Sequence, residues 1–176
     1  MPKDILISDV GAHKIWIARF YPAYEENTVL ISNGFASMGF AIPTAISAKL
    51  LYPDRNIIAA VGDGGFLMSM CEINTAVRLG LSFVCLIFND GGYGLVEWKE
   101  RLRYNRDFFV KFGNPDFVKL AESFGALGYR VTAENELLPV VRDALKQKKP
   151  AIIDCPVDYS ENIKLTEKLG RLICPL

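Results

Sequence analysis

Two polar side chains, Asp63 and Asn89, have the types and the spacing of ligands for a metal ion. Each follows an apolar run of the sequence, 57–61 in the first case and 83–88 in the second. If these runs form neighbouring parallel strands, both side chains reach one edge of a sheet, which is where open α/β sheets bind ligands. Mg²⁺ takes oxygen ligands of this kind and shares its octahedral coordination with phosphates and water. The pair therefore predicts a site for a metal ion and a diphosphate.

The residues around this pair offer further groups for such a site. Gly64 and Gly65 precede a segment with helical spacing, so their backbone N–H groups would meet phosphate oxygens at the positive end of a helix. A backbone carbonyl near Gly91 would complete the protein's share of the metal ligands. By itself, G-D-G-G also fits a simpler interpretation, a tight turn in which Asp63 bonds the local backbone.

The elements that must position this site alternate along the chain. Between Gly64 and Asn89, 24 residues intervene, which is enough for one helix and one strand and allows consecutive parallel strands to lie side by side. We expect strands at 5–8, 29–31, 57–61, 83–88, 128–131 and 151–155, and helices at 13–20, 40–51, 66–79, within 93–107, at 117–124 and at 136–148. This alternation predicts an α/β fold, a doubly wound, mainly parallel sheet with helices on both faces, in one domain of residues 1–176.

The composition argues against several classes of function. Lys plus Arg number 20, as do Asp plus Glu, so no basic field attracts nucleic acid and we expect no nucleic-acid partner. No apolar stretch approaches the roughly 20 residues that span a bilayer, and the N-terminus lacks the pattern of a signal peptide. Four cysteines without a C-x-x-C pair indicate neither a zinc site nor a disulfide framework; they are Cys71, Cys85, Cys155 and Cys174. We therefore expect no membrane partner and a cytoplasmic location.

The pattern around Asp63 and Asn89 resembles the signature of thiamine-diphosphate-dependent enzymes, because Gly62-Asp63-Gly64 is followed at the family's spacing by Asn89. The likeness extends over nearly the whole chain and points to acetolactate synthase of the catabolic, FAD-independent type. It covers only the C-terminal, diphosphate-binding domain of that enzyme. The segments that carry it are S-D-V-G-A-H-K-I-W (8–16), I-S-N-G (31–34), G-D-G-G-F-L (62–67), Y-N (104–105), F-G-N (112–114), A-E-S-F-G-A (121–126) and P-V-D-Y-S (156–160).

This resemblance implies two cofactors, thiamine diphosphate and Mg²⁺. The metal ligands would be Asp63, Asn89 and the main-chain carbonyl of Gly91, and the metal would clamp the diphosphate. Gly64 and Gly65 would belong to the same cofactor-binding turn.

Five more residues match cofactor-binding positions of the family. His13 would lie near the diphosphate, although a lone histidine near a helix start is also explained as a cap or a surface residue. The Ala36 carbonyl would accept a hydrogen bond from the aminopyrimidine. Met38 would prop the cofactor in its bent shape, although a methionine before a helix more often belongs to the core. Tyr93 and Gly94 would lie where a loop closes over the diphosphate.

The segment after Asn89 departs from the commoner family pattern. Asp90 replaces the second Asn of an N-N pair, and Glu97 stands where the amino-acid-synthesis branch has Gln, which favours the catabolic branch. Either a cofactor-facing role or a core or lid role fits the next residues, Leu95, Val96 and Trp98. A solvated face fits the basic run better than an interface or a substrate-carboxylate site; that run is Arg101, Arg103 and Arg106.

The resemblance implies an enzyme, a transferase that joins two pyruvate molecules into 2-acetolactate and CO₂. It places no catalytic residue in this chain, because the family's activating glutamate lies in an N-terminal pyrimidine domain, usually of a neighbouring subunit. We expect the pyrimidine and central domains to be absent, so that the isolated chain is inactive and forms a homo-oligomer or pairs with a pyrimidine-domain chain. Two other functions stay open: a domain of another thiamine-diphosphate-dependent 2-keto acid decarboxylase or carboligase, and a non-catalytic assembly module.

Overall fold

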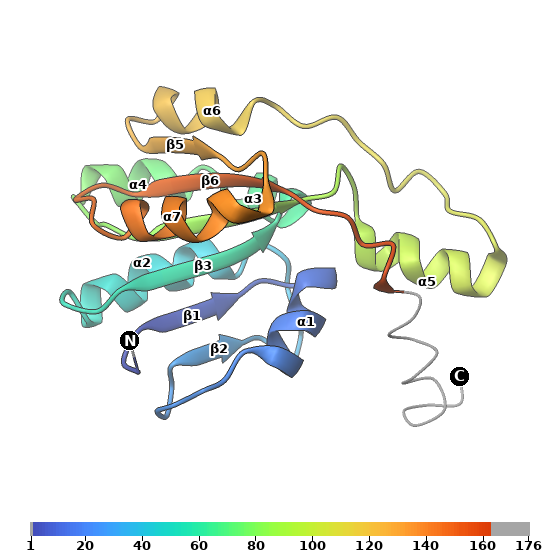
Figure 1. The fold of residues 1–176 in the computed structure, drawn as a ribbon, viewed down its shortest axis with the longest axis horizontal. Coiled ribbons are helices and arrows are strands. Elements are labelled where there is room, and N and C mark those ends of the chain that lie inside the picture. The colour runs from blue at the N-terminus through green and yellow to red at the C-terminus, as the bar shows by residue number, and fades with distance from the viewer. Residues whose placement is uncertain (1, 163–176) are drawn as a thin grey trace.

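The computed structural model describes residues 2–162, which contain a sheet of six strands that all run parallel (Figure 1). The order across the sheet is β2-β1-β3-β4-β6-β5. The strands are β1 (Ile5–Ser8), β2 (Val29–Ile31), β3 (Ile57–Gly62), β4 (Val84–Asn89), β5 (Leu127–Arg130) and β6 (Ala151–Pro156). The predicted parallel sheet is confirmed, and β3 and β4 are direct neighbours, with Gly62 opposite Phe88.

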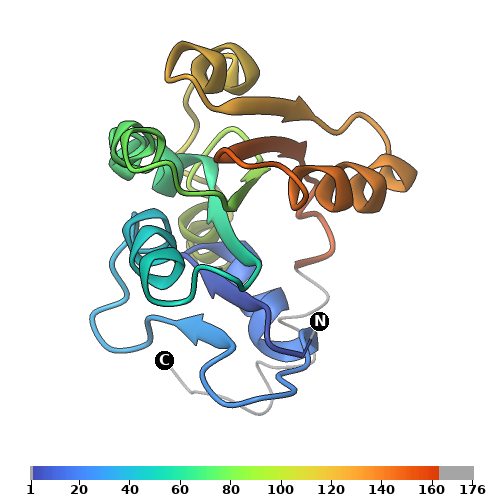
Figure 2. The same cartoon turned by 90° about the vertical axis from the view of Figure 1, so that its left-hand side faces the viewer.

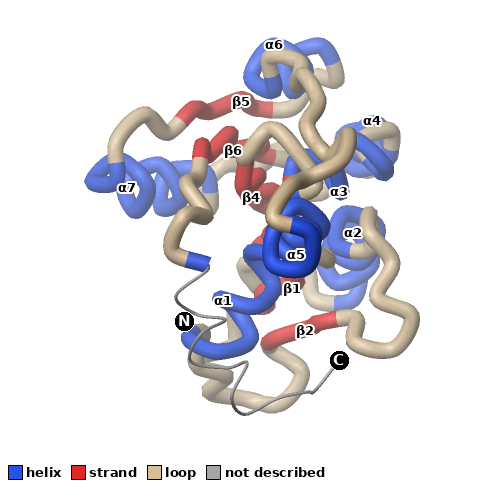
Figure 3. The backbone as a smooth tube through the Cα atoms, turned by 90° about the vertical axis from the view of Figure 1, so that its right-hand side faces the viewer, coloured by secondary structure: helices blue, strands red, loops and turns tan. Residues whose placement is uncertain are grey.

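Helices cover both faces of this sheet, as the view along it in Figure 2 shows. One face carries α2 (Ala41–Leu51), α3 (Asp63–Ser69), α4 (Glu72–Arg78) and α6 (Phe117–Ser123); the other carries α1 (Ala12–Phe20) and α7 (Glu134–Ala144). The remaining helix, α5 (Gly94–Tyr104), lies beyond the carboxyl ends of the strands and has no fully buried residue (Figure 3). The arrangement is the doubly wound fold that the alternation of elements predicts.

The larger part of the core lies between the sheet and the first group of helices. Phe66 of α3 and Phe117 of α6 are both completely buried and meet edge to face, with ring centroids 5.3 Å apart. Ile7, Val61 and Ile87 of three neighbouring strands are equally buried beneath them. Each such side chain stabilises the fold by about 1.5–3 kcal/mol relative to an exposed one. Residues at the carboxyl ends of these strands are therefore held on a rigid base.

The direction of winding changes between β1 and β3. The chain proceeds from β1 outward to β2 on one side, then returns to place β3 on the other side of β1. In open parallel sheets, ligands bind outside the carboxyl ends of the strands at such a switch point. Asp9, Asp63 and Asn89 all lie there, at the ends of β1, β3 and β4.

The predicted helix 66–79 is wrong in one respect, because the structure has two helices here. α3 begins at Asp63, so Gly64 and Gly65 lie in its first turn rather than before it. It ends at Ser69, and α4 begins at Glu72. At the junction, i→i+3 bonds from Ile73 N to Met70 O and from Asn74 N to Cys71 O replace the α-helical pattern. Both junction residues keep helical backbone angles, so a continuous helical spacing survives in the sequence.

The other predicted elements agree with the structure to within a few residues. The largest shift concerns the helix predicted at 136–148, which is α7. It begins two residues earlier because the Glu136 carboxylate accepts hydrogen bonds from the backbone N–H groups of Thr132 and Ala133, and it ends four residues earlier, at Ala144. No helix among residues 2–162 is long and apolar enough to cross a membrane. Cys174 and most of the predicted irregular tail lie outside the described residues.

Candidate cofactor and metal site

The side-chain oxygens of Asp63 and Asn89 converge on one nitrogen atom. Asn114 Nδ2 donates hydrogen bonds to Asp63 Oδ2 at 2.7 Å and to Asn89 Oδ1 at 2.9 Å. Asn114 comes from the segment between α5 and α6, which crosses this edge of the sheet. The two residues that the sequence predicts to meet are therefore neighbours, and a third side chain joins them.

Gly91 lies in the same cluster. Its backbone N–H donates to Asp63 Oδ2 at 2.8 Å, and its carbonyl accepts a hydrogen bond from Phe112 N at 3.1 Å. The left-handed backbone of Gly91, with φ of 69°, suits glycine and turns the chain back toward Asp63. The three predicted metal ligands thus stand together, each already engaged in a hydrogen bond within the chain.

A second layer of hydrogen bonds fixes the amide of Asn89. Its Nδ2 donates to the buried carboxylate of Asp154 at 2.9 Å, so its Oδ1 faces Asn114 and Asp63. Arg130 Nε donates to the other oxygen of Asp154 at 3.1 Å. The orientation of the predicted ligand oxygen is therefore set by a carboxylate at the end of β6.

The two glycines after Asp63 make room for neighbouring side chains. A Cβ on Gly65 would lie 2.9 Å from Asp9 Oδ2, and a Cβ on Gly64 would lie 2.7 Å from Cε1 of Tyr93. The N–H of Gly64 donates to Asp63 Oδ1 at 2.8 Å. The structure therefore explains both glycines by close approach of side chains, in addition to the phosphate contact expected from the sequence.

Asp9 anchors the loop that carries Met38. Its carboxylate accepts hydrogen bonds from the N–H of Val10 at 2.7 Å and of Gly39 at 2.9 Å. Burial raises the pKa of Asp9, and the backbone N–H groups around it oppose that rise. The loop that precedes α2 is in this way fastened to the end of β1.

His13 is buried in the first turn of α1 and stacks on Phe88, with ring centroids 5.3 Å apart and planes at 12°. Burial lowers the pKa of His13 to about 4, so the imidazole is neutral at pH 7. Its Nε2 has no hydrogen-bond partner among residues 2–162. A buried polar atom without a partner is uncommon, and it marks a position that a ligand would satisfy.

A cavity of about 100 Å³ joins most of these residues. Seven of the ten predicted cofactor-binding residues line it: His13, Met38, Asp63, Gly64, Gly65, Tyr93 and Gly94. Asn89 and Gly91 lie beside it, bonded to Asn114 and Asp63. Ala36 does not line it, although its left-handed backbone, with φ of 55°, shows that its loop has a specific conformation. Leu95 and Val96 also line the cavity.

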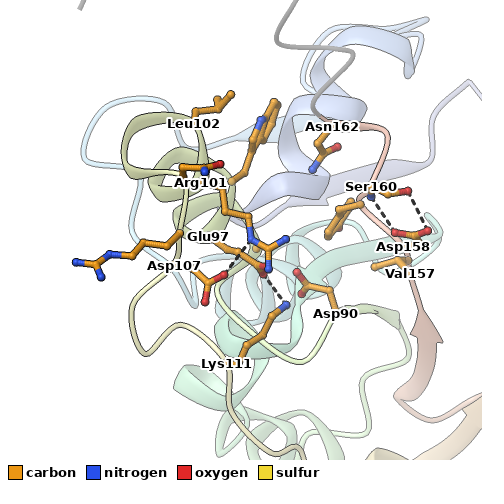
Figure 4. Close-up of a pocket in the computed structure, with 15 residues that line it drawn as sticks. Asp90, Glu97, Arg101, Leu102, Asp107, Lys111, Val157, Asp158, Ser160 and Asn162 are labelled. Carbon is orange, nitrogen blue, oxygen red and sulfur yellow. Dashed lines mark hydrogen bonds and ion pairs between the residues drawn. The ribbon is translucent and has the colours of Figure 1, made fainter.

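A larger cavity of about 850 Å³ lies next to the first, between α5 and the segment after β6 (Figure 4). Asp90, Gly94 and Tyr159 line both cavities. Burial and the nearby Asp63 carboxylate raise the pKa of Asp90 to about 6. Trp98 lines this larger cavity rather than the smaller one.

The basic run lies on the exposed side of α5 and just beyond it. Arg101 pairs with Glu97 and Asp107, while Arg103 and Arg106 lie over the rings of Tyr104 and Phe108. All three arginines are exposed, as a solvated face requires, and Arg101 and Arg106 also line the larger cavity.

Four residues of the site were given no role from the sequence. Asp9, Asn114 and Tyr159 stand inside segments that carry the family resemblance, which was the available signal. Asp154 is the fourth, and an acidic residue inside the apolar run A-I-I-D-C is the sign that could have revealed it.

The donor set suits a hard cation beside an anionic group. One carboxylate, one amide and one main-chain carbonyl are oxygen ligands of the kind Mg²⁺ takes. Among the described residues no three His, Cys, Asp or Glu side chains gather into a metal site, so a soft transition metal has no comparable set. The unpartnered Nε2 of His13 and the cavity beside Asp63 fit a polar ligand group at this position.

Comparison with known proteins gives this arrangement a family. The model of the thiamine pyrophosphate enzyme, C-terminal TPP binding domain, matches residues 9–155. The acetolactate synthase of Bacillus subtilis (strain 168) is 45% identical over 170 residues, covering 94% of this chain and 30% of the relative. The catabolic acetolactate synthase of Raoultella terrigena is 42% identical over 164 residues, covering 93% of this chain and 29% of the relative. The chain thus spans about 30% of the length of these relatives.

Proposed function

Because this chain belongs to the thiamine pyrophosphate enzyme family, as a C-terminal TPP-binding domain, we propose that it holds the diphosphate of thiamine diphosphate through a Mg²⁺ ion. The observation that carries this proposal is the convergence of Asp63 Oδ2 and Asn89 Oδ1 on a single atom, Asn114 Nδ2. Two oxygens that share one hydrogen-bond donor are close enough to share one cation. The Gly91 carbonyl would be the third ligand from the chain.

The remaining residues of the smaller cavity would hold and orient the cofactor. His13 is neutral at pH 7, so it would meet the cofactor through its unpartnered Nε2 as an uncharged polar group rather than as a positive charge. Met38 and the carbonyl of Ala36 would contact the organic part of the cofactor, on a loop that Asp9 fastens to β1. Tyr93 and Gly94 would cover the diphosphate.

The proposed reaction is that of an acetolactate synthase, from two pyruvate molecules to 2-acetolactate and CO₂. When bound, thiamine diphosphate supplies the nucleophilic carbon that this chemistry needs, and Mg²⁺ neutralises its diphosphate. The chain's own part is to bind and orient the cofactor. Identities of 45% and 42% to acetolactate synthases support this substrate class over other 2-keto acids.

Titration calorimetry with thiamine diphosphate tests the binding proposal. We expect heat of binding in the presence of Mg²⁺ and much weaker binding in its absence. The variant Asp63→Ala should lose the Mg²⁺-dependent part, because it removes the charged ligand. Glu122→Ala, which removes an exposed carboxylate on α6, is the matched control and should bind like the parent. Equal binding by Asp63→Ala and the parent would reject the site.

A further inference from the structure

All three oxygens proposed as cation ligands accept hydrogen bonds from one short segment, 112–114. Asn114 Nδ2 donates hydrogen bonds to Asp63 Oδ2 and Asn89 Oδ1, and Phe112 N donates one to the carbonyl of Gly91. The carboxyl edge of β3 and β4 is therefore closed by the chain itself.

Both acceptor positions of Asp63 Oδ2, the oxygen that faces Asn114, are occupied by hydrogen bonds. A carboxylate oxygen offers about two acceptor positions. Those of Asp63 Oδ2 are taken by Gly91 N at 2.8 Å and by Asn114 Nδ2 at 2.7 Å. A cation that binds this oxygen must displace one of the two donors. Gly91 N belongs to the backbone of a tight turn, whereas the side chain of Asn114 is able to rotate about its own bonds.

The surroundings of Asn114 favour that rotation. Its Oδ1 is buried and has no hydrogen-bond partner among the described residues, so the amide is held only through its nitrogen. The backbone on its N-terminal side is fixed separately, since Tyr93 N donates to Val110 O at 2.9 Å. The rings of Tyr93 and Phe112 also pack, with centroids 4.9 Å apart. The side chain can therefore leave the two oxygens while the segment stays in place.

We propose that Asn114 is an internal competitor of the cation: its NH₂ group and the metal ion are alternative occupants of the position between Asp63 and Asn89. This inference rests on the proposed function of the two ligands. In the absence of a cation the amide keeps both oxygens satisfied, and cation binding has to break two hydrogen bonds. Asn114 thereby sets the affinity of the site without being one of its ligands.

Mn²⁺ is a suitable probe, because free Mn²⁺ is measured directly by electron paramagnetic resonance. We titrate Asn114→Ala with Mn²⁺ in the presence of thiamine diphosphate and expect it to bind Mn²⁺ roughly three- to tenfold more tightly than the parent. In this variant water takes the place of the amide at the two oxygens, and it competes with the cation less strongly than the amide does. Asn114→Asp, which cannot donate to either oxygen and adds a negative charge, should bind more tightly still. Asn74→Ala, on the exposed side of α4, is the matched control and should not differ from the parent.

Unchanged or weaker Mn²⁺ binding in a folded Asn114→Ala variant would overturn the inference. A measurement on the unaltered chain covers the case in which the variants do not fold. The side-chain NH₂ resonances of Asn114 should shift and exchange with solvent faster once Mg²⁺ and thiamine diphosphate are added, while those of Asn74 stay constant. Saturable binding that leaves the Asn114 resonances unmoved would contradict the proposal equally.

The Asp63→Ala variant separates this inference from the proposed function. If the parent binds Mn²⁺ and Asp63→Ala does not, the site is correct, and the behaviour of Asn114 alone decides the competition. If the parent binds no Mn²⁺ with thiamine diphosphate present, both the site and the competition are rejected.

Discussion

At the scale of single residues, the site depends on side chains whose environment changes their ordinary chemistry. His13 is nearly 98% buried against Phe88, and this burial, rather than any neighbouring charge, holds its pKa near 4. Asp90 lies in the opposite situation, since burial and the Asp63 carboxylate raise its pKa to about 6. Both groups change charge below neutral pH, with opposite effects on stability.

His13 should make the fold sensitive to acid. Its folded pKa of about 4 lies below the unfolded value of 6.5, so the unfolded chain binds more protons between these values and stability falls as pH decreases from about 6.5 to 4. Between pH 7 and pH 5 this group should cost about 2 kcal/mol of unfolding free energy. Urea unfolding of the parent and of His13→Gln at pH 7 and at pH 5 measures how the unfolding free energy of each protein changes with pH. The contribution of Asp90 is the same in both proteins, so it cancels when the two changes are subtracted. An equal pH dependence of the two proteins would show that His13 is not buried as described.

Some contacts of the site follow from the sequence and others do not. The apolar runs and the 24-residue spacing were enough to predict that Asp63 and Asn89 meet. No local pattern connects either residue to Asn114, because that contact joins positions 51 and 25 residues apart through an irregular segment. The same holds for Asp154, whose contact with Asn89 depends on the order of strands β4 and β6. Side-chain networks between elements follow from the tertiary fold, which periodicity does not encode.

At the scale of elements, α3 links the core to the site. Its Phe66 is anchored under the sheet, while its first turn consists of Asp63, Gly64 and Gly65. The sequence predicted a helix here but started it three residues late, because glycines argue against a helix interior. Their presence in the first turn is explained by the close approach of Asp9 and Tyr93.

Gly65→Ala should therefore destabilise the protein, although alanine is the better helix former. Its methyl group would lie 2.9 Å from Asp9 Oδ2, which cannot move aside without breaking the bond to Gly39 N. We expect a loss of about 1–3 kcal/mol in unfolding free energy, as for other overpacked positions. Gly34→Ala is the control, since no atom lies within 4 Å of its added Cβ. Thermal or urea unfolding of both variants checks this, and equal stability would contradict the close contact.

At the scale of the whole molecule, the fold leaves large apolar side chains in solvent. Phe35, in the loop that also carries Met38, is 96% exposed, and Phe109 near Asn114 is fully exposed. Both belong to loops that approach the carboxyl edge of the sheet. Contiguous apolar patches on a surface mark places that a partner covers, and exposed aromatic side chains are the usual components of such patches. The two exposed rings are consistent with the expectation from the sequence that the chain pairs with a second domain or chain.

We expect the purified 176-residue chain not to convert pyruvate by itself. The family resemblance implies that the activating glutamate lies in a pyrimidine domain, and no segment of this chain resembles that domain. An assay for acetolactate with pyruvate, thiamine diphosphate and Mg²⁺ should give no turnover above the protein-free reaction. Addition of a pyrimidine-domain chain from a relative is the positive arm of the same assay. Clear turnover by the chain alone would reject the proposal.

The closed hydrogen-bond network at the ends of β3 and β4 has a consequence for the order of events in the cell. Because Asn114, Gly91 and Phe112 already donate hydrogen bonds to the three oxygens proposed as cation ligands, we expect the chain to finish folding before it meets either cofactor. Biosynthesis and loading are then separate steps. We expect a shortage of Mg²⁺ or of thiamine diphosphate to leave a folded apoprotein that can still bind both.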